Sequence, residues 1–89
     1  MRLRVRIPGH LKEYVPRHVY ERAGGEPGDF TVDVDGPLSL RELLLTIGLR
    51  PELAIGALLS GQRISRDDII GDDGEIIILS PIAGGQRDG

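Results

Sequence analysis

Charged and apolar residues alternate strictly near the start of the chain, over residues 2–7. Successive side chains of a strand point to opposite faces, so this pattern predicts a half-buried strand. We expect Leu3, Val5 and Ile7 to face a core and Arg2, Arg4 and Arg6 to face water. The same alternation over residues 30–34 predicts a second strand, with inward positions at Phe30, Val32 and Val34.

A helix is the best-marked element, and Ser39 is its predicted N-cap. Glu42 follows three residues later, which is the spacing of a capping box. The apolar positions follow the i, i+3, i+4, i+7 spacing of one helix face, at Leu40, Leu43, Leu44 and Ile47. Gly48 can adopt the left-handed conformation that ends a helix, with Leu49 folding back on the last turn. Pro51 prevents continuation.

The second half of the chain predicts three further strands, over residues 55–59, around Ile64, and over residues 75–80. Turns over Ser60-Gly61-Gln62-Arg63 and Asp72-Asp73-Gly74 separate them. Residues 65–70 are expected to form a connection with a tight helical turn. The order strand, strand, helix, strand, short strand, strand predicts an α+β fold. One amphipathic helix must then cover one face of a mixed sheet of four to five strands, which is the β-grasp arrangement.

Residues 10–28 have the least regular pattern. Residues 11–20 could hold a short helical turn that Pro16 interrupts, and residues 24–28 predict a flexible loop. His10 and His18 lie here, but no cysteine or second close ligand supports a metal pair.

The acidic turns near residues 67–73 lack the alternating Asp spacing and terminal Glu of a calcium loop. We therefore expect no metal site.

Composition narrows the class of protein. With 89 residues, 39% of them hydrophobic, the chain is expected to form one domain over residues 1–80, followed by a flexible tail over residues 81–89. It has no cysteine, which excludes disulfides and thiol catalysis. The net charge of −3 argues against nucleic-acid binding, so the arginines of residues 2–6 are interpreted as a solvated strand face. The longest apolar run, residues 76–79, is too short for a membrane span, and the start lacks a signal core, so a cytoplasmic location is expected.

Two features exceed what folding requires. Residues 76–79 are apolar on both faces of the last strand, and Leu58 is out of phase with its neighbours. With one face of the sheet covered by the helix, Leu58, Ile77 and Leu79 are expected to form an exposed apolar patch for docking, unless the 10–28 segment covers it.

The second feature is the tail Pro81-Ile82-Ala83-Gly84-Gly85, whose side chains become smaller along the sequence. Gly84 and Gly85 permit close backbone approach, so such a tail could thread a narrow channel in another protein. A frayed terminus would also explain it. We found no phosphate-binding loop, zinc motif or nucleophile–base pair, and expect no catalytic residues in this chain.

The sequence resembles the ThiS/MoaD family of ubiquitin-like sulfur carriers. The resemblance rests on the first strand, the helix start at residues 39–44, the Asp73-Gly74-Glu75 turn and the Ser80–Gly85 ending. It covers nearly the whole chain except residues 10–28, which are longer than in the thiamin type and nearer the molybdopterin type.

The resemblance implies that the protein is not an enzyme and binds no cofactor itself. A ubiquitin-activating-like partner enzyme would use ATP to adenylate the carboxyl group of Gly85, with Gly84 beside it and Ile82 and Ala83 in the threading arm. Sulfur from a persulfide would displace AMP to give a thiocarboxylate. A sulfur-accepting synthase would then receive the sulfur, in thiamin, molybdopterin, amino-acid, tRNA or secondary-metabolite synthesis.

The family's diglycine usually ends the chain, whereas residues 86–89 follow it here. This departure implies a precursor that a metalloprotease would cleave after Gly85. Two alternative functions remain open. The protein could be a ubiquitin-like modifier, or it could be a β-grasp interaction module whose tail is not processed.

Overall fold

The structure, a computed structural model, describes residues 1–81. Its centre is a five-stranded sheet in the order β2-β1-β7-β4-β5. The bounds of the elements are β1 Arg2–Arg6, η1 Gly9–Tyr14, α1 Arg17–Glu21, β2 Asp29–Asp33, β3 Leu38–Ser39, α2 Leu40–Thr46, η2 Pro51–Leu53, β4 Gly56–Leu59, β5 Gln62–Ile64, β6 Ile69–Ile70 and β7 Gly74–Leu79, where η marks a 3₁₀ helix.

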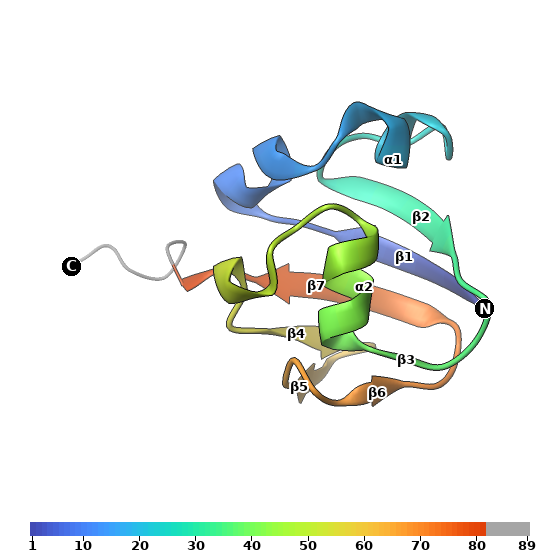
Figure 1. Cartoon of the computed structure of the whole chain (residues 1–89), viewed down its shortest axis with the longest axis vertical. Coiled ribbons are helices and arrows are strands. Elements are labelled where there is room, and N and C mark those ends of the chain that lie inside the picture. The colour runs from blue at the N-terminus through green and yellow to red at the C-terminus, as the bar shows by residue number, and fades with distance from the viewer. Residues whose placement is uncertain (82–89) are drawn as a thin grey trace.

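The sheet is mixed, as the order of elements predicts. β1 is antiparallel to β2 and parallel to β7, and β4 is antiparallel to both β7 and β5. α2 crosses one face of this sheet (Figure 1). The predicted α+β, β-grasp fold with one main helix is confirmed, with five strands in the main sheet.

The core lies between the sheet and α2. Its fully buried members come from both layers and include Leu3, Val5, Leu40, Leu43, Leu44, Ile47, Ala57, Ile76 and Ile78. Each apolar residue predicted to face inward from the first strand is buried. The core therefore follows from the period-two pattern of the strands and the helical spacing of α2.

Both ends of α2 are closed as predicted. The Glu42 backbone N–H donates to Ser39 Oγ at 3.0 Å, and the Ser39 backbone N–H donates to Glu42 Oε1 at 2.8 Å. At the other end, Gly48 has φ +91° and its N–H donates to the Leu45 carbonyl. The Leu49 N–H donates to the Leu44 carbonyl, which completes a Schellman motif.

The segment predicted as an interrupted turn and loop contributes to the core. η1 and α1 flank Pro16, which is the N-cap of α1 rather than a break within one helix. Leu11 and Val15 are buried. The Pro16 ring also lies against Gly48 at the end of α2, since a Cβ on that glycine would be 2.5 Å from Pro16 Cδ. The segment thus extends the helical layer on the α2 side of the sheet.

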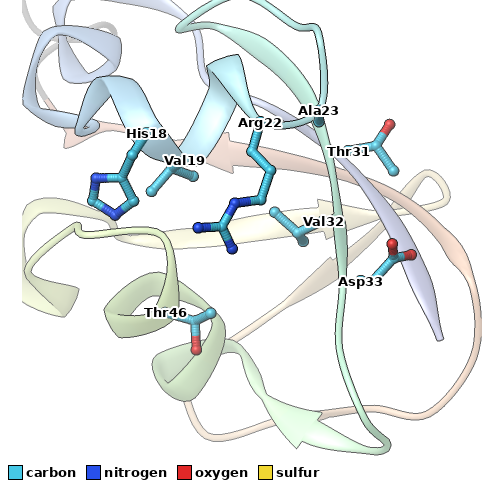
Figure 2. Close-up of a pocket in the computed structure, with 8 residues that line it drawn as sticks. All are labelled: His18, Val19, Arg22, Ala23, Thr31, Val32, Asp33 and Thr46. Carbon is cyan, nitrogen blue, oxygen red and sulfur yellow. The ribbon is translucent and has the colours of Figure 1, made fainter.

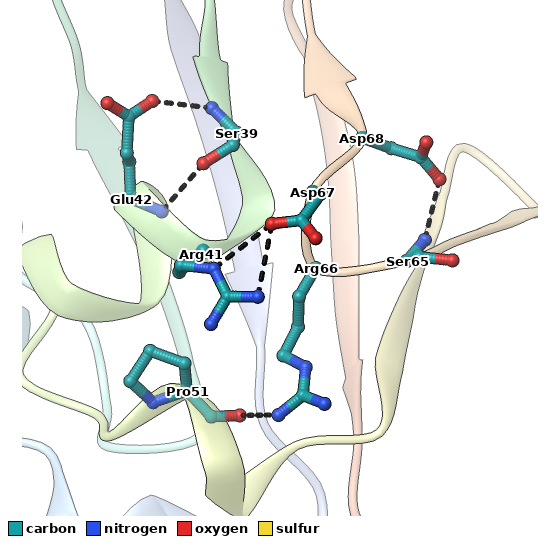
Figure 3. A network of polar contacts seen from close by, with 8 residues as sticks. All are labelled: Ser39, Arg41, Glu42, Pro51, Ser65, Arg66, Asp67 and Asp68. Atoms are coloured by element: carbon teal, nitrogen blue, oxygen red, sulfur yellow. Dashed lines mark hydrogen bonds and ion pairs between the residues drawn. The ribbon is translucent and has the colours of Figure 1, made fainter.

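The connection over residues 65–70 holds one tight turn, in which the Asp68 N–H donates to the Ser65 carbonyl at 3.1 Å, and it ends in a short strand that the sequence did not predict. β6 pairs with β3 just before α2, with Ile70 opposite Leu38. The loop before β6 is held by polar contacts (Figure 3). Arg41 at the start of α2 forms an ion pair with Asp67 at 3.1 Å, and the Ser65 N–H donates to Asp68 Oδ2 at 2.7 Å. The Asp67 carboxylate thus ties the loop to the start of α2, and the Asp68 carboxylate closes the loop on itself.

None of the helices in residues 1–81 is both long enough and apolar enough to cross a membrane.

Candidate functional site

The candidate site is the face of the sheet opposite α2, here called the open face. Its half over β1 and β2 carries ion pairs. Three of them join arginines of β1 to carboxylates of the neighbouring strands: Arg2–Asp33 at 3.0 Å, Arg4–Asp29 at 2.8 Å and Arg6–Glu75 at 3.3 Å. The arginines predicted to face water are therefore neutralised by partners in this fold, which agrees with a solvated strand face rather than an anion-binding stripe.

These pairs shift the pKa values of their members. The hydrogen bond from Arg4 lowers the pKa of Asp29 below its usual value, and the hydrogen bond from Arg2 does the same for Asp33. The same bonds raise the pKa of both arginines. All four side chains are exposed, so the pairs contribute little to stability and serve mainly to mask charge.

The other half of the open face carries the apolar strip, defined as Leu58, Ile77 and Leu79. In the sheet register Leu58 is opposite Ile77, and Gly56 is opposite Leu79, so the three side chains lie on the face away from α2. Ile76 and Ile78 alternate with Ile77 and Leu79 along β7, and both are fully buried. The strip is half-buried rather than fully exposed. The register thus places these three side chains on the face that the sequence predicts for them, away from α2. Their role in docking remains a prediction.

The 10–28 segment was the alternative cover for this strip. Its buried residues Leu11 and Val15 belong to the core cluster, and its Pro16 lies against the end of α2. It therefore lies on the helix side of the sheet (Figure 1). None of its contacts given for residues 1–81 covers the apolar strip.

Two arginines border the apolar strip. Arg6 is opposite Ile77 on one side, and Arg63 is opposite Leu58 on the other. Arg63 forms no ion pair within residues 1–81; its guanidinium donates to the Ile55 carbonyl at 3.5 Å. The sequence predicts Gln62 and Arg63 within the turn, whereas the structure places both in β5. The position of Arg63 follows from the two-residue Ser60-Gly61 turn, which sets this pairing once the hairpin is recognised.

The Ser60-Gly61 turn has positive φ at both residues, 48° and 91°. This combination is typical of the type I′ turns that suit a two-residue hairpin. The turn therefore determines which residue of β5 stands beside the apolar strip.

The predicted tail begins where the apolar strip ends. β7 ends at Leu79, Ser80 is 9% exposed, and Pro81 is exposed. The residues predicted for adenylation and threading, Gly85, Gly84, Ile82 and Ala83, lie outside the described residues, as does the extension over residues 86–89. The tail therefore follows directly on β7, a central strand that carries two of the three strip residues, Ile77 and Leu79.

Comparison with solved structures finds the same fold in the crystal structure of SAMP1 from Haloferax volcanii, with a TM-score of 0.60 and 20% sequence identity. The match covers 96% of this chain and 100% of the SAMP1 chain. No protein-family model matches the sequence, and neither does any curated protein. At this identity the likeness concerns the fold, and the chain has a ubiquitin-like β-grasp fold.

Proposed function

We propose that the protein is a ubiquitin-like sulfur carrier, acting with partner enzymes and without catalytic residues of its own. In this proposal the carboxyl group of Gly85 is the working group. The observation that carries it is the position of the apolar strip, on the uncovered face and on the last strand before the tail. The likeness of the fold to a ubiquitin-like protein supports it.

Geometry explains why this position suits a carrier. A partner that buries Leu79 and Ile77 holds the strand from which the tail leaves. Gly85 is six residues beyond Leu79 in the sequence, so it can lie at most about 20 Å from the docking surface. A partner docked on the apolar strip can therefore receive Gly85 in an active site within that reach.

The chemistry needs an activated carboxyl group. The Gly85 carboxylate attacks the α-phosphorus of ATP and releases pyrophosphate, which gives an acyl adenylate on the partner enzyme. The outer sulfur of a persulfide then attacks the acyl carbon and displaces AMP, which gives an acyl disulfide. A thiol of a partner protein attacks the other sulfur of that S–S bond, so a new disulfide forms on the partner side and the Gly85 thiocarboxylate is released. A sulfur-accepting synthase is the final partner. Gly85 is followed by Gln86, so a protease must first hydrolyse that peptide bond to free the carboxylate.

The test compares two forms of the chain with a candidate activating enzyme, one ending at Gly85 and one continuing to Gly89. We expect ATP–pyrophosphate exchange with the first form only, because four further residues place the terminal carboxylate up to about 14 Å from the reacting position. A third form ending at Gly84 is the matched control and should also be inactive. Mass spectrometry should then find one oxygen of the Gly85 carboxyl group replaced by sulfur.

Three results would contradict parts of this proposal. Equal exchange with the form ending at Gly89 would remove the need for processing. An isopeptide bond from Gly85 to lysines of other proteins, without a thiocarboxylate, would favour a ubiquitin-like modifier. No exchange with any form would favour an interaction module.

A further inference from the structure

A groove lies between α1, β2 and the end of α2, along the free edge of β2. It has a volume of about 450 Å³, and residues from all three elements line it (Figure 2). This volume is within the range of small-molecule sites. The groove shares no residue with the apolar strip or the tail. A ligand in the groove would therefore be independent of the proposed sulfur-carrier function.

The floor of the groove is apolar. Val19 of α1 and Val32 of β2 are half-buried and pack against the core. Thr46 of α2 forms the opposite side, and its hydroxyl donates to the Glu42 carbonyl oxygen at 2.8 Å. The floor therefore offers contact to an apolar group.

The wall formed by α1 and its C-cap residue carries the positive charge of Arg22. His18 and Arg22 lie one helical turn apart, and their side chains point toward the space between α1 and α2 (Figure 2). Six of the nine arginines in residues 1–81 are in ion pairs. Arg22 has neither an ion pair nor a hydrogen bond within that part of the chain. Its five N–H donors are available to a ligand.

Nearby carboxylates are turned to other partners. Asp33 also lines the groove, but its carboxylate accepts from Arg2 at 3.0 Å and points away from Arg22 (Figure 2). Glu21, next to Arg22 in sequence, forms its ion pair with Arg17 at 3.1 Å. The positive charge of Arg22 is therefore left uncompensated beside an apolar floor.

We propose that this groove binds a small organic anion with a flat apolar body. The anionic group, a phosphate, sulfonate or carboxylate, would pair with the Arg22 guanidinium beside His18, and the body would lie against Val19 and Val32. Arginine suits this role because its planar fork binds such groups with two hydrogen bonds. The 10–28 segment thereby has a role beyond packing, since it supplies Arg22 to the groove.

Phenyl phosphate is a suitable probe, because it combines the ring and the anion. We expect a titration followed by NMR to give saturable shifts at His18, Val19, Arg22 and Val32. Inorganic phosphate and phenol each provide only half of the ligand and should bind more weakly to the same residues. Arg22→Gln should weaken phenyl phosphate binding about tenfold, because it removes a charged hydrogen-bond donor pair.

Arg63→Gln is the matched control. It removes the same charge from an arginine without an ion pair on the open face, so a general electrostatic attraction would weaken equally in both variants. Unchanged binding by Arg63→Gln supports the groove. The proposal is wrong if both variants weaken binding equally, if the shifts gather on Leu58 and Ile77, or if no saturable shift occurs. Circular dichroism of each variant checks that the fold is retained.

Discussion

Gly48 shows how a single residue can link two elements. Its φ of +91° is one that residues with side chains rarely adopt, and a Cβ there would be 2.5 Å from Pro16 Cδ. We expect Gly48→Ala to lower the free energy of unfolding by about 2–4 kcal/mol, from backbone strain together with overpacking. Gly36→Ala is the control, since nothing lies within 4 Å of the Cβ it would add. Urea denaturation of both variants measures the difference.

The N-cap at Ser39 gives a second prediction at this scale. Ser39→Ala removes the acceptor for the Glu42 N–H and should cost roughly 0.5–2 kcal/mol of unfolding free energy. Ser65→Ala is the control, because Ser65 contributes its backbone N–H, not its hydroxyl, to the bond with Asp68. Equal midpoints for the two variants would show that the cap contributes nothing.

Local rules made these two residues predictable from the sequence. The capping box and the terminal glycine depend on spacings within one helix, so the chain around Ser39 and Gly48 contains all the information. The contact of Gly48 with Pro16 could not be predicted from local spacings, because it joins residues that are 32 positions apart. Arg22 was missed for the same reason: its significance comes from neighbours on β2 and α2.

At the scale of elements, the ion pairs between β1 and β2 add a small contribution to stability that depends on pH. The folded-state pKa values of Asp29 and Asp33 are lowered, so the stability they contribute is present above the unfolded-state pKa, about 3.9. It is lost as the pH falls from there through the lower folded-state pKa values. We expect the double variant Asp29→Asn, Asp33→Asn to lose less stability than the wild type between about pH 4 and pH 2.

Urea midpoints measured across that pH range test this. Asp35→Asn is the control, because Asp35 is exposed and forms no ion pair in the described structure. It should change with pH as the wild type does. A double variant with the acid sensitivity of the wild type would show that the ion pairs have no role in it.

Long strands and the amphipathic helix were predictable, but the short elements were not. β3 and β6 have two residues each, too few for an alternating pattern, and they meet across about 30 positions of sequence. η1 and α1 were underestimated because Pro16 appears as a break in the sequence. In the structure it starts a new helix, and this lets Leu11 and Val15 enter the core.

For the whole molecule, the decisive question is which face of β7 meets a partner. The period-two rule allowed this face to be predicted from the sequence, because residues 76–79 are apolar at every position and only one face is covered by α2. Ile76 is fully buried and Ile77 half-buried. Of these two adjacent residues, Ile76 thus belongs to the core, and Ile77 lies on the face that we propose for docking.

We expect Ile76→Asp to abolish cooperative folding, because it places a charge in the core without a partner. Ile77→Asp should retain the fold, because its side chain can reach water on the open face. Thermal unfolding followed by circular dichroism distinguishes the two. If Ile77→Asp also unfolds the protein, the open face is part of the stabilising core and cannot serve as a free docking surface.

The folded Ile77→Asp variant then tests the proposed site. In the form ending at Gly85, it should reduce ATP–pyrophosphate exchange by a candidate activating enzyme, because a charge in the apolar strip must be desolvated for docking. Thr31→Asp adds the same charge on the same face but at the far edge, on β2 opposite Arg4, so it should leave exchange nearly unchanged. A loss confined to Ile77→Asp places the partner on the apolar strip. Equal losses would indicate only a dependence on the charge of the whole face, and unchanged exchange in both would mean that the partner recognises the tail without the strip.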